Sequence, residues 1–164
     1  MKILYYGGQK SGKSSLAEKH ILQLSKNSKP FYIATYDNSY NDPEMERRID
    51  THIARRGELF NTIEEPKKLN KVIKENSSYI VDCISMWILN NLETNENELF
   101  NQLDDIAEKD ANIVFVLNNV TEGVIPMDKT SRKFVDLTGV IGQRLAQLCD
   151  EVYEVKLGIP RRLK

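Results

Sequence analysis

The residues best suited to chemistry are eight consecutive positions near the amino terminus, spaced as G-x-x-x-x-G-K-S. They are Gly7, Gly8, Gln9, Lys10, Ser11, Gly12, Lys13 and Ser14. In such a loop the glycines let successive backbone N–H groups point at phosphate oxygens, the lysine reaches the β- and γ-phosphates, and the serine hydroxyl binds Mg²⁺. We therefore expect GTP or ATP with Mg²⁺ at this loop, with Lys13 catalytic and Ser14 a metal ligand.

The segments on either side match what this loop requires. An apolar run over 2–6 is typical of a buried parallel strand. After the loop, Leu16, Ala17, Ile21 and Leu24 recur at helical spacing. A helix that starts there directs the positive end of its dipole at bound phosphates. The alternative, a glycine-rich turn without a ligand, does not account for the order strand, loop and helix.

A second candidate site is one face of a predicted helix over 43–56. Arg48, His52, Arg55 and Arg56 share that face, because they are four, seven and eight residues from the first of them. Guanidinium groups bind phosphoryl oxygens, and a neutral imidazole can attack phosphorus to form a covalent intermediate. The spacing alone favours a solvated basic face with a bystander histidine, and the phosphate-binding interpretation stays open beside it.

Charged side chains at the ends of other segments have two interpretations each. Asp82 ends an apolar strand and either contacts Mg²⁺, directly or through water, or caps a turn. Glu64 and Glu65 either contact a nucleotide ribose or metal, or open the next helix. Arg132 and Lys133, at the start of a long helix, either clamp a triphosphate or are solvated.

Apolar strand-like runs alternate with helix-like runs, which predicts one α/β domain over residues 1–164 with a mostly parallel sheet flanked by helices. The predicted strands cover 2–6, 31–35, 79–82, 113–117 and 151–157, and a short strand after Gly158 closes a C-terminal hairpin. The predicted helices cover 13–26, 43–56, 66–75, 85–91, 96–109 and 131–148. The polar segment 120–130 predicts a mobile loop over the site.

Composition narrows the class of protein. A formal net charge of −1 argues against a general electrostatic binder of nucleic acid. No apolar run is long enough to span a bilayer, and the start of the chain does not read as a signal peptide. Cys83 and Cys149 are predicted to be reduced thiols of a cytoplasmic protein. Of the two histidines, His20 lies beside an apolar helix stripe, which favours a structural role.

Taken in order, these segments resemble the bifunctional adenosylcobinamide kinase/adenosylcobinamide-phosphate guanylyltransferase family of cobalamin synthesis. The resemblance covers essentially the whole chain. Besides the loop, it rests on 32–35, Glu44-Met45 with Arg48-Ile49 and His52, 62–66, 81–83 with Trp87, 90–92, 123–126, 143–146, 150–152 and 158–160. The ordered set is specific, because other kinases with this loop do not carry Arg-Ile-x-x-His together with Gly-x-Ile-Pro.

The resemblance implies a RecA-like P-loop domain with two activities. The kinase step moves a γ-phosphate from a nucleotide to a hydroxyl of adenosylcobinamide, a corrinoid. The second step places GMP on a histidine, which falls on His52, and passes it to the phosphorylated corrinoid. Glu64 and Asp82 fall on nucleotide- or metal-contacting acids. Contacts to guanine nucleotide fall on Thr35, Tyr36, Asp37, Arg55 and Arg56. The resemblance also implies a homotrimer.

The chain departs from the family pattern at two places. Asn118-Asn119-Val120-Thr121 stands where the family reads Asn-Glu-Val-Gly, and Ile141-Gly142-Gln143 stands where it reads Leu-Asn-Gln. Both places are expected on the corrinoid or lid side. They leave two alternatives open: a kinase that has lost guanylyl transfer, and a nucleotide-binding regulatory protein without chemistry.

Overall fold

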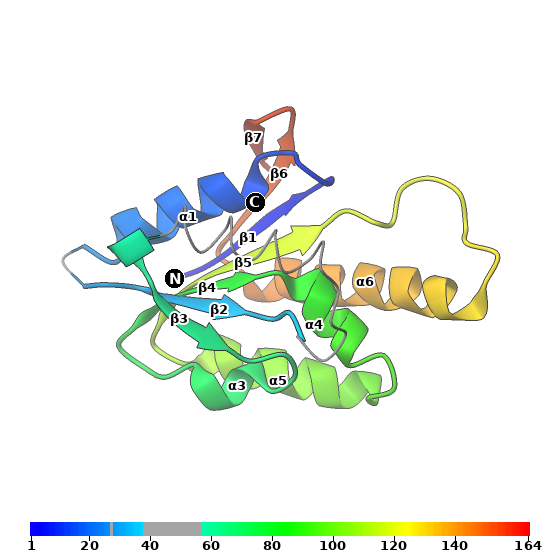
Figure 1. The fold of residues 1–164 in the computed structure, drawn as a ribbon, viewed down its shortest axis with the longest axis horizontal. Helices are drawn as coiled ribbons and strands as arrows, with labels where there is room; N and C mark the ends of the chain where they lie inside the picture. Colours follow the sequence, from blue (N-terminus) through cyan, green and yellow to red (C-terminus); the bar gives the residue numbers. More distant parts are fainter. Residues whose placement is uncertain (27, 38–56) are drawn as a thin grey trace.

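The computed structural model describes residues 1–26, 28–37 and 57–164, and these form a seven-stranded sheet between two helical layers (Figure 1). The strand order is β3-β2-β4-β5-β1-β6-β7. All neighbours are parallel except β6 and β7, which form the C-terminal antiparallel hairpin. The bounds are β1 Lys2–Gly7, β2 Phe31–Ala34, β3 Asn61–Glu64, β4 Ser78–Asp82, β5 Asn112–Asn118, β6 Glu151–Lys156 and β7 Ile159–Arg162.

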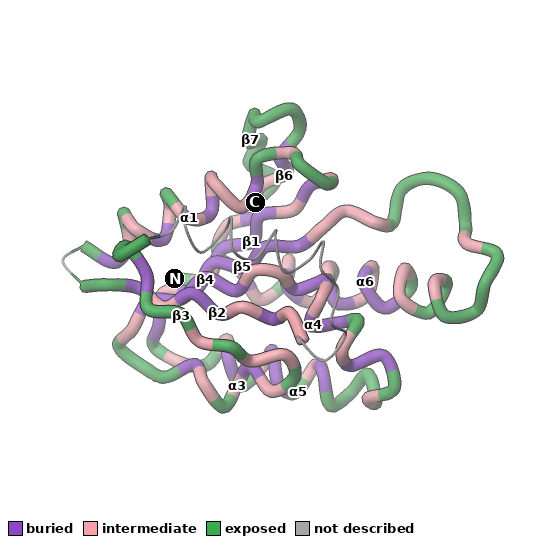
Figure 2. The backbone as a smooth tube through the Cα atoms, viewed as in Figure 1, coloured by how far each residue is buried: buried purple, intermediate pink, exposed green. Residues whose placement is uncertain are grey.

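The helices divide between the two faces of the sheet. Helix α1 (Lys13–Leu24) covers one face, where Ile3 and Tyr5 point into its core. The other face carries the larger core, which includes Leu4 and Trp87. The remaining helical segments are η2 Gly57–Leu59, α3 Leu69–Val72, α4 Ile84–Asn90, α5 Glu96–Glu108 and α6 Lys129–Leu148. Because both faces are covered, the central strands are buried along most of their length (Figure 2).

The structure confirms the α/β class, the mostly parallel sheet and the C-terminal hairpin. It differs from the prediction at two neighbouring elements, β3 and α3. Strand β3 was not predicted, because at this edge of the sheet its residues are mostly exposed and carry no apolar run. The helix predicted over 66–75 is only α3. It starts late because the Glu65 carboxylate binds the backbone N–H groups of Lys67 and Lys68 in a turn. The predicted helix 43–56 lies outside the described residues.

Two other expectations were tested in the described part of the chain. No helix there is long and apolar enough to cross a bilayer. His20 joins an aromatic cluster in which its Nδ1 lies 3.0 Å from the Tyr5 hydroxyl and its ring meets Tyr5 and Tyr153 edge-on. These contacts favour the structural interpretation of His20.

We expect the fold to lose stability at alkaline pH, because several buried acids are held neutral, among them Tyr5 and Cys149. Burial raises the pKa of Tyr5 from 10.0 to about 12 and that of Cys149 from 9.0 to about 12. Both groups ionise earlier in the unfolded chain. Their contribution to the free energy of unfolding is therefore complete below about pH 9 and is lost between about pH 9 and 12. Urea unfolding followed by the fluorescence of Trp87, the single tryptophan, checks this. The stability of Cys149→Ala should decline less steeply with rising pH than that of the wild type. An identical decline would contradict the assignment to that thiol.

Candidate nucleotide site

The phosphate loop lies at the carboxyl end of β1, between that strand and α1 (Figure 1). Positive φ angles at Lys10 (55°) and Gly12 (94°) curl the loop. Lys13 is only 6% exposed and its ammonium donates to the Gly8 carbonyl at 3.1 Å, so the side chain folds back into the loop. Burial lowers the Lys13 pKa, and the nearby Asp82 charge opposes this effect. An anion in the loop would relieve the same burial cost.

The loop offers groups that suit phosphate oxygens. Gly12 precedes α1 without any side-chain cap, so the first N–H groups of this twelve-residue helix are available to an anion. The Ser11 hydroxyl oxygen is buried and has no hydrogen-bond partner among the described residues. A buried polar atom left unpaired costs about 1–3 kcal/mol, which a phosphate contact would offset. Ser14 follows directly in the first turn of α1.

Asp82 ends β4, separated from β1 by β5 alone, and points toward the same region. The Tyr32 hydroxyl donates to Asp82 Oδ2 at 2.6 Å. The Asp82 charge acts on Lys13 and raises the pKa of its ammonium, against the effect of burial. The described residues contain no cluster of three His, Cys, Asp or Glu side chains that could hold a metal ion. Asp82, the Ser14 hydroxyl and the nucleotide's own phosphates are oxygen groups of the kind that Mg²⁺ prefers.

Thr35 has a structural task that the sequence did not reveal. It is fully buried, and its hydroxyl donates to the Cys83 carbonyl at 2.7 Å and accepts from the Cys83 N–H at 3.0 Å. These bonds fix the backbone that follows Asp82. Burial raises the pKa of the Cys83 thiol to about 12, so this side chain stays neutral. Thr35 therefore acts on the site at least through the residue after Asp82.

Asn90 holds two segments of the site together, a role that the sequence did not predict. The residue itself belongs to the Asn-Asn-Leu segment on which the family resemblance rests. Its amide nitrogen donates to the Thr35 carbonyl at 2.7 Å and to the Pro66 carbonyl at 3.1 Å. These bonds join the segments that follow β2 and β3. Glu64, at the end of β3, is exposed and lies beside Ala34 in the sheet register. Nothing in the sequence reveals these two bonds, because Asn90 donates to backbone carbonyls, which every residue carries.

The other predicted contacts to guanine nucleotide divide into two groups. Tyr36 and Asp37 follow β2 and are half-buried, so they lie at the same carboxyl edge of the sheet as Asp82. His52, Arg55 and Arg56 lie outside the described residues. The structure therefore brings together the loop, Asp82 and the segment after β2, and leaves the histidine face as a prediction.

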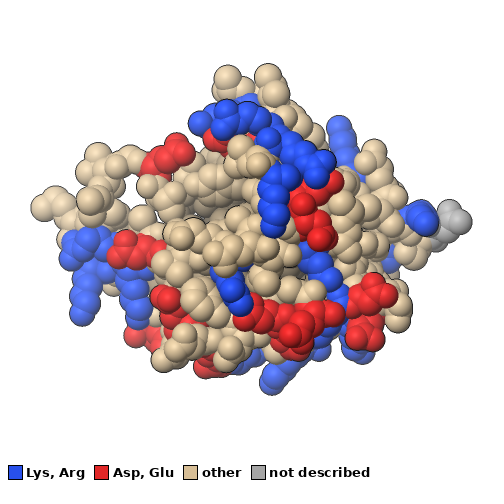
Figure 3. All heavy atoms as spheres, turned by 180° about the vertical axis from the view of Figure 1, so that it is seen from behind, with Lys and Arg blue, Asp and Glu red and all other residues tan. Residues whose placement is uncertain are grey.

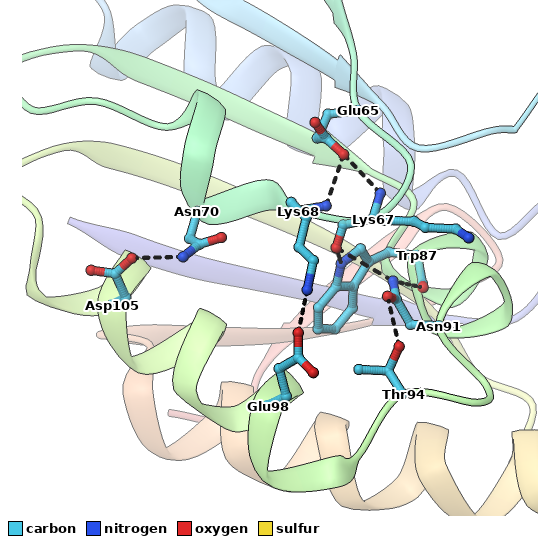
Figure 4. Close-up of polar contacts among 9 residues, drawn as sticks. All are labelled: Glu65, Lys67, Lys68, Asn70, Trp87, Asn91, Thr94, Glu98 and Asp105. Carbon is cyan, nitrogen blue, oxygen red and sulfur yellow. Dashed lines mark hydrogen bonds and ion pairs between the residues drawn. The ribbon is translucent and has the colours of Figure 1, made fainter.

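Glu65 and its neighbours form a polar network on the α4 side (Figure 4). The Glu65 carboxylate accepts from the N–H groups of Lys67 and Lys68 at 2.9 and 2.8 Å. The Trp87 indole N–H donates to the Lys67 carbonyl at 2.9 Å, and the Asn91 amide donates to the Trp87 carbonyl at 2.8 Å. The second interpretation of Glu65, that it organises the turn before the next helix, is the one these bonds favour.

Arg132 and Lys133 are occupied away from the phosphate loop. The Arg132 guanidinium donates to the Pro126 and Met127 carbonyls, and the Lys133 ammonium pairs with Glu93 at 3.1 Å. Arg132 therefore fixes the segment that leads into α6. In the segment that leads into α6, the side chains of Val124, Ile125 and Met127 are highly exposed.

The two departures from the family pattern have local structural roles. The Thr121 N–H donates to Asn119 Oδ1 at 3.2 Å, and its hydroxyl lies 3.1 Å from the Tyr6 hydroxyl. A β-carbon at Gly142 would lie 3.3 Å from Leu117 Cδ2, so glycine lets α6 approach β5 closely. Both positions serve the packing and the turn beside the site, and neither contacts the phosphate loop in these bonds.

Comparison with known proteins completes the description of the site. A family model described as "Cobinamide kinase / cobinamide phosphate guanyltransferase" matches residues 3–163. The chain is 34% identical to the "Bifunctional adenosylcobalamin biosynthesis protein CobP" of Pseudomonas aeruginosa, covering 100% of this chain and 98% of that protein. It is 29% identical to the protein of Escherichia coli named "Bifunctional adenosylcobalamin biosynthesis protein CobU", over the full length of both.

Among solved structures, the flagellar accessory protein FlaH of Methanocaldococcus jannaschii superposes with a TM-score of 0.55 at 16% identity, over 99% of this chain and 77% of that one. At this identity the likeness shows the fold alone. It supports the RecA-like P-loop architecture that the parallel sheet and the phosphate loop already indicate.

Proposed function

Because the chain belongs to the cobinamide kinase / cobinamide phosphate guanyltransferase family, a group of cobalamin biosynthesis enzymes with both activities, we propose how its residues share the two reactions. The phosphate loop and Asp82 carry the kinase step, and His52 carries guanylyl transfer. The observation that carries the first assignment is the buried Lys13 ammonium, which folds into the loop and feels the Asp82 charge.

In the kinase step, the protein positions a nucleoside triphosphate and neutralises its charge. Lys13 and the N-terminus of α1 bind the phosphates, while Ser14 and Asp82 would hold Mg²⁺, which would supply further charge neutralisation. The hydroxyl oxygen of adenosylcobinamide forms a bond to the γ-phosphorus and its proton passes to solvent, while the bond from that phosphorus to the bridging oxygen breaks. The nucleoside diphosphate leaves. Such a transfer needs little covalent help from the protein.

In the guanylyl step, a neutral His52 nitrogen bonds to the α-phosphorus of GTP and pyrophosphate leaves. The phosphate oxygen of adenosylcobinamide phosphate then attacks the same phosphorus, the nitrogen–phosphorus bond breaks, and adenosyl-GDP-cobinamide results. We assign six residues to contacts with the guanine nucleotide: Thr35, Tyr36, Asp37, Arg55, Arg56 and Glu64. Because the imidazole must be neutral to attack, this step should slow as the pH falls and the ring becomes protonated.

The direct test incubates the protein with GTP labelled at the α-phosphate and Mg²⁺, followed by denaturing electrophoresis. We expect a protein-bound label that is labile in acid and stable in alkali, as a phosphoramidate is. A parallel assay measures phosphorylation of adenosylcobinamide. Kinase product without label would indicate the kinase-only alternative, and nucleotide binding without either product would indicate the regulatory one.

Asp82→Asn should weaken the response to Mg²⁺ while leaving the loop intact. Asparagine keeps an oxygen near the Tyr32 hydroxyl but removes the charge that attracts the cation. We expect the Mg²⁺ concentration for half-maximal kinase activity to rise about tenfold or more. Asp104→Asn is the matched control, because Asp104 pairs with Arg144 between α5 and α6. An unchanged Mg²⁺ dependence in Asp82→Asn would remove Asp82 from the metal site.

The resemblance also leads us to propose a homotrimer that works in the cytoplasm. Sedimentation equilibrium tests the oligomeric state, and a monomer at all protein concentrations would contradict it.

A further inference from the structure

The tip of the C-terminal hairpin touches the phosphate loop. Lys156 and Ile159 pair across a two-residue turn. The Gly158 N–H donates to the Ser11 carbonyl at 2.9 Å, and a β-carbon on Gly12 would lie 3.3 Å from Gly158 Cα. The turn therefore forms part of the outer wall of the loop, on the β6 side of β1 (Figure 1).

Leu157 occupies this turn against two structural preferences. Its φ is 53° and that of Gly158 is 80°, the pattern of a type I′ hairpin turn, in which Asn-Gly is the favoured pair. A leucine pays a steric cost in the left-handed region. It also gains no burial, because it is 96% exposed. Neither turn geometry nor the core accounts for a leucine at this position. Because the turn lies against the phosphate loop, this apolar side chain stands beside the place where a nucleotide would bind.

The order of the strands indicates which part of a ligand lies there. Strand β1 stands between β5 and β6, and Asp82 ends β4 beyond β5. Lys13 and Asp82 thus hold the terminal phosphates toward the β4 side of the loop. The opposite end of a triphosphate, its nucleoside, then extends toward β6 and β7.

Basic side chains accompany the apolar tip. Lys156 and Arg161 both pair with Glu154, at 3.0 and 3.1 Å. The space-filling view shows basic side chains gathered toward the top of the molecule, the end at which Figure 1 places the hairpin (Figure 3). An apolar contact next to positive charge suits a nucleotide, which combines a flat base with an anionic tail.

We propose that Leu157 contacts the nucleoside of the nucleotide that donates the phosphoryl group, while the Gly158 N–H holds the turn against the phosphate loop. This inference rests on the proposed kinase function of that loop. It places the donor nucleoside across the loop from Thr35 and Glu64, the residues assigned to the guanine of the second reaction. An apolar contact to a ring face does not distinguish adenine from guanine, so it suits either donor.

The test compares two ligands in Leu157→Asn by calorimetric titration with Mg²⁺. The first is the non-hydrolysable ATP analogue AMP-PNP, since a guanine nucleotide would also occupy the guanylyl site. The second is inorganic tripolyphosphate, which has no nucleoside. We expect the Kd of AMP-PNP to rise about tenfold and that of tripolyphosphate to stay within about twofold. Asparagine tolerates positive φ, so the Tm of the free protein should rise by about 1–3 °C.

Leu163→Asn is the matched control. Leu163 is also an exposed leucine (53%) of the same hairpin, but its N–H bonds to Val152, at the end away from the turn. It should leave both affinities unchanged. The proposal is overturned if Leu157→Asn binds AMP-PNP like the wild type, or if it loses both ligands equally. If the wild-type protein binds neither ligand, the proposed kinase function of the loop is wrong. That result can be told apart from the two results for Leu157→Asn.

Discussion

Lys13→Met is expected to lower kcat/KM of the kinase step by roughly a thousandfold, with little change in stability. Methionine keeps most of the length and apolar volume of the side chain, so the buried part of the loop stays filled. What disappears is the ammonium, which is held within the loop by the Gly8 carbonyl. Charge stabilisation by a preorganised cation in such a site contributes about 10²–10³ or more in rate.

The measurement is steady-state phosphorylation of adenosylcobinamide at several nucleotide concentrations. Lys19→Met is the control, because Lys19 is an exposed lysine of the same helix. It should retain wild-type activity, and both variants should unfold at the wild-type temperature. A Lys13→Met enzyme within tenfold of the wild type would show that the loop binds the nucleotide without contributing to transfer.

His52→Asn should abolish the guanylyl-enzyme while leaving phosphorylation of adenosylcobinamide within about threefold of the wild type. An amide cannot form the nitrogen–phosphorus bond that the histidine forms, so the loss of label should exceed roughly a thousandfold. The kinase residues Lys13, Ser14 and Asp82 are untouched by this change. The experiment measures the α-phosphate label and the kinase product in the same preparations.

The other histidine supplies the matched control. His20→Gln can keep a polar contact to the Tyr5 hydroxyl, so this variant should still be labelled. Label surviving in His52→Asn would mean that another side chain is the nucleophile. Loss of both activities would mean that His52 also supports the phosphate loop, which is not part of the proposed division of labour.

The two departures from the family pattern bear on which activities survive. Thr121 is tied into a turn by Asn119 Oδ1, and Gly142 gives α6 room against Leu117. Because both changes are accommodated locally, we expect them to leave the nucleotide site and its kinase step unaltered. The label and kinase assays described above decide whether guanylyl transfer is also retained.

Local patterns in the sequence were sufficient for the phosphate loop and for the α/β class. The loop depends on consecutive residues, so its glycines, Lys13 and Ser14 are recognisable without any tertiary contact. The central strands are buried on both faces, so they are visible in the sequence as apolar runs such as 2–6 and 113–117. The family could also be identified, because the order of many short segments is itself a linear property.

Only the tertiary structure decided the roles that depend on residues far apart in the chain. The sequence could not show that Thr35 fixes the backbone of Cys83, that Asn90 joins the segments after β2 and β3, or that Gly158 supports Ser11. Strand β3 escaped prediction because an exposed edge strand needs no apolar pattern. In each case the deciding contact is a hydrogen bond to backbone, and backbone carbonyls and N–H groups are the same whichever residues supply them.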